Sequence, residues 1–290
     1  MAGRGRGNEV NIQPGRKKPA HALLAPSKSD IWLNCLAAPA LWAQLPEVPA
    51  GFAAEEGTLC HTLAQAALSI NDIPWTAGMK FTVENREIEI TDEMLNVLQL
   101  YVTLVADLRD RLSWSHVEQR LDISGLWTGE AQAPPQDVFG TGDFIGCGDE
   151  HGIGWNVLYV IDLKYGRGHA VTVEENTQLM IYAIGAFQKL LEERPDLAAK
   201  VRLVNLVIVQ PRAGGAPVRT WTIPLGEVLA WAHLTLKPSI DQINKGTPSE
   251  LKAGRWCYFC QAGPICPALR ALKMANAVEA LPEWNEEDYV

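Results

Sequence analysis

The chain has 290 residues, of which 47% are hydrophobic and 20% charged, and its formal net charge is −9. That length and apolar content suffice for one large folded domain or two small ones and exclude an intrinsically disordered chain. No apolar stretch reaches the roughly 18 to 20 residues that span a bilayer, and the start lacks the apolar run of a signal peptide. We therefore expect a cytoplasmic protein without a membrane partner.

The two ends of the chain differ in charge, and neither shows periodicity. Residues 1–20 are rich in Gly, Arg, Pro and Lys and predict a disordered basic arm. Residues 276–290 are acidic and predict a solvated tail. The folded domain is expected over residues 21–275. Its negative charge argues against a protein that coats duplex DNA.

Helical periodicity predicts three helices in the first part of the domain, over residues 25–45, 55–70 and 91–112. Ser29 or Asp30 can cap the first helix and Thr91 the third. Thr58 can cap the second helix, which would put His61 in its first turn. A lone histidine on a helix is more typical of a core or surface residue than of a site.

Short apolar runs broken by glycines predict four strands, over residues 116–123, 139–148, 155–166 and 201–211. The last two are apolar enough for the interior of a sheet. Between them, residues 172–193 predict a helix in which Thr172 and Glu175 have capping-box spacing. This order of elements predicts a mixed α/β fold with helices on the faces of the sheet. The phosphate-binding motif G-x-x-x-x-G-K-[ST] is absent from the sequence.

Charged residues interrupt the two adjacent glycine-flanked strands. Asp162 and Lys164 are two apart and share one face of a strand. A hairpin with the preceding strand would bring Asp143 next to Asp162. Two close carboxylates repel unless a proton or a cation lies between them, and oxygen ligands suit Mg²⁺ or Mn²⁺. The alternative is a buried Asp–Lys ion pair at a strand end.

Four short motifs follow one another along the chain: GTLCH, GTGD, VIDLK and QLMIY. Their order resembles the RecB-like branch of the PD-(D/E)xK nucleases, whose patterns are GxxxH or GTxxH, GxxD, (D/E)xK and QxxxY. The resemblance covers roughly residues 27 to 267. It implies a restriction-endonuclease-like mixed central sheet flanked by helices. Asp162 stands where glutamate is common in the wider superfamily, although aspartate is usual in this branch.

The resemblance implies the following ligands of Mg²⁺ or Mn²⁺: His61, Asp143, Asp162 and the carbonyl of Leu163. Lys164 would orient or polarise the attacking water. Gln178 and Tyr182, four apart on one helix face, would hold the substrate or support the site, although such a pair is also common in a core. Glu118 falls where such nucleases often have an acid, and Glu56 is a weaker candidate.

Three of the six cysteines have the spacing C-x2-C-x5-C, which leaves a four-coordinate site one ligand short. The nuclease resemblance implies a [4Fe-4S] cluster that joins the N-terminal helices to the C-terminus. We call Cys35 together with residues 257–266 the cysteine clasp; its ligands would be Cys35, Cys257, Cys260 and Cys266. Zinc and unligated thiols are the alternatives. Cys60 and Cys147 are expected to be small buried residues.

The resemblance extends to CRISPR-associated adaptation nucleases, the AddB nuclease domain and stand-alone phage versions. It implies a DNA exonuclease that acts on ends or single strands in phage replication or recombination, with replication or recombination proteins as further partners. Trp114, Trp127 and Trp155 are candidates either for base stacking or for the core. The alternatives are a non-catalytic DNA-binding or assembly subunit with the same fold and a zinc-stabilised protein unrelated to nucleases. The oligomeric state stays open.

Overall fold

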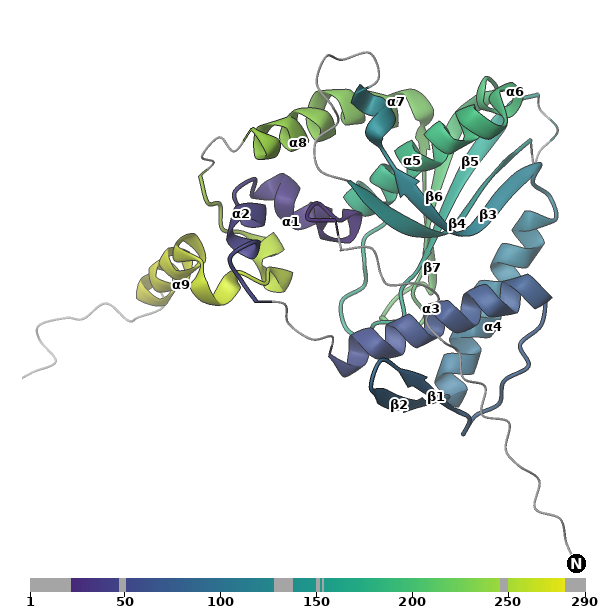
Figure 1. Ribbon diagram of the computed structural model, residues 1–290, viewed down its shortest axis with the longest axis horizontal. Coiled ribbons are helices and arrows are strands. Elements are labelled where there is room, and N and C mark those ends of the chain that lie inside the picture. The colour runs from purple at the N-terminus through teal and green to yellow at the C-terminus, as the bar shows by residue number, and fades with distance from the viewer. Residues whose placement is uncertain are drawn as a thin grey trace, which may run out of the picture.

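A five-stranded sheet runs through the centre of the molecule in the order β3-β4-β5-β6-β7 (Figure 1). In this computed structural model the strands are Trp114–Asp122 (β3), Phe139–Gly148 (β4), Asn156–Leu163 (β5), Val201–Val209 (β6) and Val218–Pro224 (β7). Only the β5–β6 pairing is parallel within this sheet. The predicted mixed α/β class is confirmed. The two apolar strands β5 and β6 lie in the interior of the sheet, as their composition predicts.

The structure describes residues 22–46, 51–127, 138–149, 152, 154–245 and 250–279. The predicted basic arm lies outside these residues, and so does most of the predicted acidic tail. The first residues of that tail belong to a helix, α9, which ends at Glu279.

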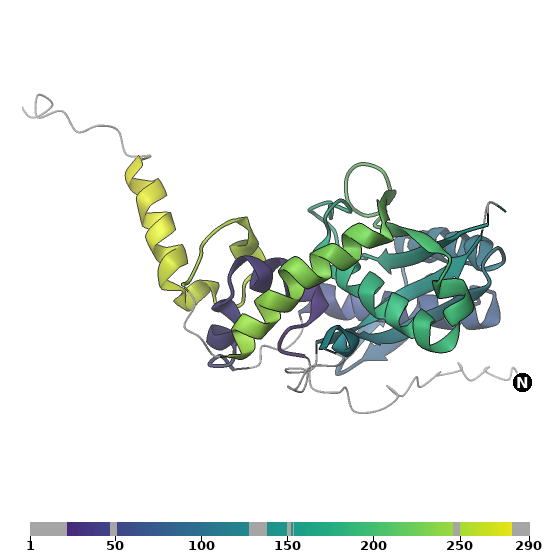
Figure 2. The ribbon, with the colours of Figure 1, turned by 90° about the horizontal axis from the view of Figure 1, so that it is seen from above.

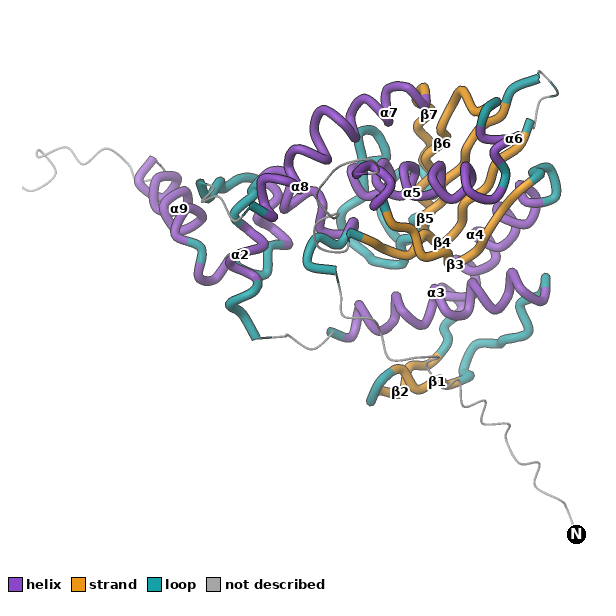
Figure 3. Tube along the Cα trace, turned by 45° about the horizontal axis from the view of Figure 1, so that its top comes forward, coloured by secondary structure: helices purple, strands orange, loops and turns teal. Residues whose placement is uncertain are grey.

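Helices cover both faces of the sheet, and Figure 3 shows the strands between α5 and the pair α3 and α4. The bounds are Phe52–Ile70 (α3), Asp92–Arg109 (α4), Thr177–Glu193 (α5) and Leu225–Trp231 (α7). Alternation along β5 divides its side chains between two cores. Leu158 and Val160 join the core under α5 and α7, whereas Ile161 and Leu163 join the core under α3 and α4.

The remaining elements lie around this sandwich. Near the N-terminus are Pro26–Lys28 (η1), Ser29–Asn34 (α1) and Ala38–Trp42 (α2). A two-stranded hairpin, Lys80–Val83 (β1) and Arg86–Glu89 (β2), lies beside α3 (Figure 1). The short connections are Ser124–Trp127 (η2), Pro195–Ala198 (α6), the π-helical turn Ala232–Leu236 (η3) and Lys237–Asn244 (α8).

The C-terminal elements return to the N-terminal helices. They are Arg255–Phe259 (η4), Gly263–Ile265 (η5) and Pro267–Glu279 (α9). Figures 1 and 2 both show this region beside α1 and α2, with α9 extending away from the sheet. Contacts between α1 and η4 join the two regions.

Of the four predicted helix caps one, Thr91, is confirmed, and three are wrong. Thr58 lies inside α3, where its hydroxyl donates to the Ala54 carbonyl at 3.0 Å. Thr91 caps α4 by accepting a hydrogen bond from the Met94 N–H at 3.2 Å. Ser29 lies inside α1, where its hydroxyl bonds the Thr177 hydroxyl at 2.6 Å because the two helices meet there. The cap of α5 is Asn176, whose side chain accepts from the Leu179 N–H.

No helix in the described part of the chain combines the length and the apolar character needed to cross a bilayer. The sequence missed the β1–β2 hairpin and the edge strand β7. Both carry polar residues on exposed faces and lack a continuous apolar run.

Candidate metal and nuclease site

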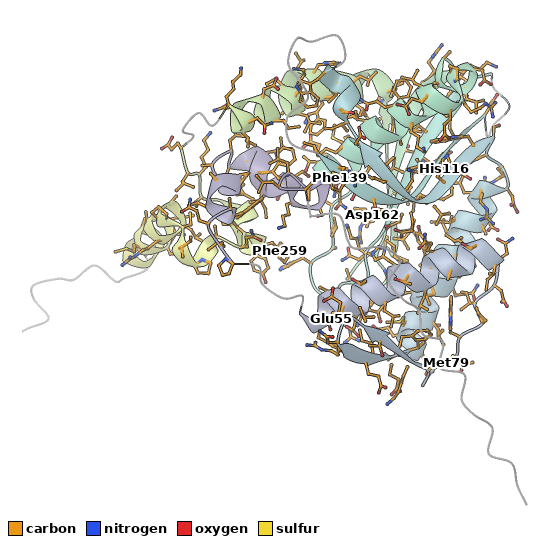
Figure 4. The ribbon with its side chains drawn as sticks, in the orientation of Figure 1. Glu55, Met79, His116, Phe139, Asp162 and Phe259 are labelled. Atoms are coloured by element: carbon orange, nitrogen blue, oxygen red, sulfur yellow. The ribbon has the colours of Figure 1, made fainter. Side chains whose placement is uncertain are left out.

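Two aspartates meet where the β4–β5 ladder ends. The last paired residues are Phe144 and Ile161, and Asp143 and Asp162 lie one position beyond them on their respective strands. Asp143 Oδ2 accepts a hydrogen bond from the Leu163 N–H at 2.6 Å. This hydrogen bond from the Leu163 amide holds the Asp143 carboxylate against β5, the strand that carries Asp162. Figure 4 shows Asp162 in the middle of the molecule.

A polar network links Asp162 to the helix above it. Lys164 Nζ lies 2.7 Å from Asp162 Oδ2 and donates to Gln178 Oε1 at 3.0 Å. The Gln178 amide donates in turn to Asp162 Oδ1 at 3.2 Å and to the Tyr182 hydroxyl at 3.3 Å. One glutamine thus holds both members of the ion pair, with Asp162 almost fully buried. The 2.7 Å contact is an ion pair without hydrogen-bond alignment, so Asp162 Oδ2 has no aligned donor.

A histidine and an acid approach Asp143 from other elements. His61 Nδ1 lies 3.2 Å from Asp143 Oδ1 and 4.0 Å from Glu118 Oε1. The predicted place of His61 in a first helical turn is wrong, because α3 begins at Phe52 and His61 lies in its middle. The ligand atoms of His61, Glu118 and Asp143 all lie within 4.8 Å of one another.

Glu118 has an unusual backbone conformation. Its φ is 50°, and it interrupts the pairing of β3 with β4 between Val117 and Gln119. A glutamate in the left-handed region is strained, and such strain is often found at functional sites. The interruption lies directly opposite Asp143, where it brings the Glu118 carboxylate into the group.

Burial and mutual charge set the protonation of this group. Burial lowers the pKa of His61, but the Asp143 carboxylate outweighs burial and the pKa rises to about 9. Burial opposes ionisation of Asp143, yet His61 and the Leu163 amide hold the pKa of Asp143 below its usual range. Burial raises the pKa of Glu118 to about 7, and burial also raises the pKa of Asp162. Without a cation this group therefore retains protons.

A hollow of about 600 Å³ opens onto the site and is lined by Ser27, Thr58, His61, Glu118 and Asp143, among others. A divalent cation fits the donor set, which offers an imidazole nitrogen and several carboxylate oxygens. Asp162 Oδ2 is a further buried oxygen of this group that could act as a ligand, although Lys164 Nζ lies 2.7 Å from it. Glu56 is outside the three-residue group.

Two residues of the site were not expected from the sequence. A Cβ at Gly140 would lie 2.8 Å from the Tyr182 ring, so the first glycine of GTGD admits that ring. Tyr101 of α4 is buried, and its hydroxyl has no hydrogen-bond partner among the described residues. Burial raises the pKa of Tyr101, and Asp143, Glu118 and Asp162 add to that effect. In the sequence, Tyr101 is one of several apolar and aromatic residues of the helix predicted over residues 91–112, and nothing distinguishes its hydroxyl.

The structure brings the cysteines of the clasp to neighbouring elements. Cys35 and Cys266 are buried, and Cys257 and Cys260 are half-buried. The Lys252 N–H points at Cys35 Sγ at 3.5 Å, the Gly254 N–H at Cys257 Sγ at 3.4 Å, and the Trp42 indole N–H at Cys260 Sγ at 3.5 Å. Such donors suit thiolates held by a metal or cluster.

The spacing of the thiols bears on the choice between zinc and a cluster. Thiolates bound tetrahedrally to zinc at about 2.3 Å lie ~3.8 Å apart. In the described part of the chain, the one group of three potential ligand atoms within 4.8 Å of one another is that of His61, Glu118 and Asp143, and it contains no cysteine. No three of these sulfurs therefore lie within 4.8 Å of one another in the described chain.

Fold and site together define a mixed α/β protein with a histidine, three acids and a lysine gathered at one end of its central sheet. The chain belongs to the family described as "Protein of unknown function (DUF2800)", whose model matches residues 21–288.

Two solved structures show weak similarity. A "Putative exonuclease" from Eubacterium rectale is 10% identical with a TM-score of 0.39, and the match covers 86% of this chain and 87% of that one. SSO0001 is 17% identical with a TM-score of 0.32, and the match covers 60% of this chain and 68% of that one. Both TM-scores are too low to establish a common fold.

Proposed function

We propose that this protein is a metal-dependent nuclease that hydrolyses phosphodiester bonds of DNA at free ends or in single strands. The observation that carries the proposal is the joint geometry of Asp143, Asp162, Lys164 and Gln178 beside the open hollow that holds His61 and Glu118. A purely structural ion pair would need neither the additional acids nor access from solvent.

Mg²⁺ or Mn²⁺ would be held by His61, Asp143, Asp162 and the Leu163 carbonyl, with Glu118 as a further acid. When bound, such an ion makes water a nucleophile at neutral pH and neutralises charge on the phosphate. Retained protons on His61 and Glu118 must leave when the ion binds.

The protein's own residues supply position and charge. Lys164 presents a cation near the attacked phosphate, and burial of its side chain strengthens that charge's effect. Gln178 fixes Lys164 and Asp162 relative to each other because it bonds both. Tyr182 anchors the Gln178 amide from one helical turn away.

For the cysteine clasp we favour a [4Fe-4S] cluster over zinc, because no three of its sulfurs lie within 4.8 Å of one another in the described chain. The three N–H donors suit either occupant. We assign the cluster a structural role: it would join the N-terminal helices to the C-terminal elements. Phage replication or recombination, with partner proteins of that process in the host cytoplasm, is the setting that the sequence resemblance favours.

The test is degradation of end-labelled single- and double-stranded DNA in Mn²⁺ by anaerobically purified protein. Asp162→Asn and Lys164→Gln should each reduce the rate at least a hundredfold, an effect on the order of that seen when a single preorganised charge is removed. Asp196→Asn, which breaks an exposed ion pair with Arg194, is the matched control and should keep the full rate.

A wild-type protein that is folded and loaded with Mn²⁺ but leaves every substrate intact would overturn the enzymatic proposal. Binding of DNA without hydrolysis would then identify the alternative, a non-catalytic DNA-binding or assembly subunit.

A further inference from the structure

A groove of about 1030 Å³ begins at the candidate site and leads toward the cysteine clasp. Lys164 and Gln178 line its end at the site, and Phe259 of η4 lines it at the clasp. Ser27 borders both this groove and the hollow that holds His61. The candidate site therefore lies where two open spaces meet, and a polymer could occupy both.

Aromatic rings from three separate elements line this groove: Trp221 of β7, Trp231 of α7 and Phe259 of η4. The two tryptophans are half-buried, and Phe259 is 75% exposed. Phe259 is held edge-on by Tyr258, with ring centroids 4.7 Å apart, and Tyr258 is held in the same way by His169. Figure 4 shows Phe259 on the clasp, away from Asp162. An exposed ring that is fixed in place offers a face to a planar ligand.

The charges that line the groove favour single-stranded over double-stranded nucleic acid. Two cations, Arg255 and Lys164, line it together with four acids, Asp30, Glu174, Glu175 and Glu227. A duplex presents phosphates on two strands and would meet these carboxylates without enough cations to offset them. A single strand can turn its uncharged bases to the rings and place one or two phosphates at Arg255 and Lys164.

We propose that this groove binds single-stranded nucleic acid by base stacking on Trp221, Trp231 and Phe259 and feeds the strand to Lys164. This inference rests on the proposed nuclease function and assigns the strand-binding residues of the same site. Trp114 and Trp127, two of the three sequence-based candidates for stacking, are buried, and their indoles donate to Glu193 and Asp241. The third, Trp155, is half-buried against the core under α3 and α4 and does not line the groove. The clasp consequently supplies part of the binding surface as well as a connection between the chain ends.

The test measures binding without hydrolysis, using the full chain in a buffer without added divalent ions. Fluorescence anisotropy of a short labelled oligothymidylate is compared with that of a blunt hairpin duplex. Phe259→Ala and Trp231→Ala should each weaken binding of the single strand by about 5- to 100-fold, the usual effect of removing one stacking ring. Phe259→Tyr, which keeps a ring, should bind like the wild type.

Matched controls are available on η3 and η5, the elements that follow α7 and η4 in the chain. Leu234 and Ile265 are 78% and 53% exposed and lie outside the groove. Leu234→Ala and Ile265→Ala should leave binding unchanged. With two phosphate contacts, the slope of log affinity against log salt should be about −1.4.

The groove assignment is overturned if the wild type does not bind the single strand, if it binds the duplex equally well, or if both ring deletions bind normally. Failure of the nuclease function gives a different result: the single strand still binds and the ring deletions still weaken binding, but Mn²⁺ produces no cleavage.

Discussion

The site at the end of the sheet and the cysteine clasp differ in what holds them together. Every residue of β5 is buried, and the side chains of Asp162, Lys164 and Gln178 bond one another. In the clasp, by contrast, neither η4 nor η5 contains a buried side chain, and Ile265 and Phe259 are exposed. Protein packing therefore holds the first region, whereas the second has few buried residues besides Cys35 and Cys266 and would be held by the proposed cluster.

Removal of a clasp ligand should have the largest effect on stability. A link between Cys35 and the C-terminal cysteines closes a loop of roughly 220 residues, and by the chain-entropy model such a link contributes ~5 kcal/mol. Cys35→Ser should therefore lose its iron and lower the thermal midpoint sharply. The measurements are iron content and a thermal melt.

Cys147→Ala is the control for this change. Cys147 is buried in β4, and burial raises the pKa of its thiol to about 12, so the thiol is inert. The Cys147→Ala variant should keep its iron, and its free energy of unfolding should fall by about 1 kcal/mol. Equal iron in Cys35→Ser and the wild type would contradict the clasp.

The second-largest effect on stability is expected from a substitution at Gly140, a crowded position in the packed site. Gly140→Ala places a Cβ 2.8 Å from the Tyr182 ring, and overpacking of this kind costs about 1–3 kcal/mol. The free energy of unfolding by urea measures the change. Gly226→Ala, where the added Cβ meets nothing within 4 Å, should cost nothing, and an equal loss in both variants would refute the close approach.

Metal binding should depend on pH. Asp143 raises the pKa of His61 to about 9 even though burial works in the opposite direction, and burial raises that of Glu118 to about 7. A cation binds the deprotonated forms, so protons are released and Mn²⁺ affinity increases as the pH rises, by up to about tenfold per pH unit for each proton.

Calorimetric titration with Mn²⁺ between about pH 6 and 8 measures this slope. His116→Gln, on the surface of β3, is the control and should show the wild-type slope. Affinity that does not change with pH would mean that the ion binds elsewhere.

The smallest effect is expected from Tyr101→Phe. The Tyr101 hydroxyl has no hydrogen-bond partner in the part of the chain that the structure describes, so its loss should change the free energy of unfolding by no more than about 0.5 kcal/mol. If that hydroxyl donates to water or to a carboxylate oxygen of the site, the cleavage rate should fall about tenfold, the usual effect of one charged hydrogen bond. An unchanged rate would assign Tyr101 to the core alone.

The sheet interior could be predicted because β5 and β6 are long apolar runs, and the position of Asp143 beside the Asp162 strand follows from strand alternation and a hairpin. The caps could not be predicted so well, because Ser29 bonds a distant helix and Asn176 competes with Thr172. The contribution of Glu118 depends on a local interruption of β3 that no sequence pattern marks.

The parallel pairing of β5 with β6 requires a connection across the sheet, and α5 is that connection. One uninterrupted stretch, residues 139–209, thus contains Asp143, Asp162, Lys164, Gln178 and Tyr182. Among the proposed metal ligands in the described chain, only His61 and Glu118 come from earlier segments. Transferring the site to another protein would therefore require moving one continuous segment, residues 139–209, and adding the side chains of His61 and Glu118. Recombination between related genes could exchange this segment as a unit. The cysteine clasp would not be exchanged with it, because Cys35 and residues 257–266 lie outside the segment.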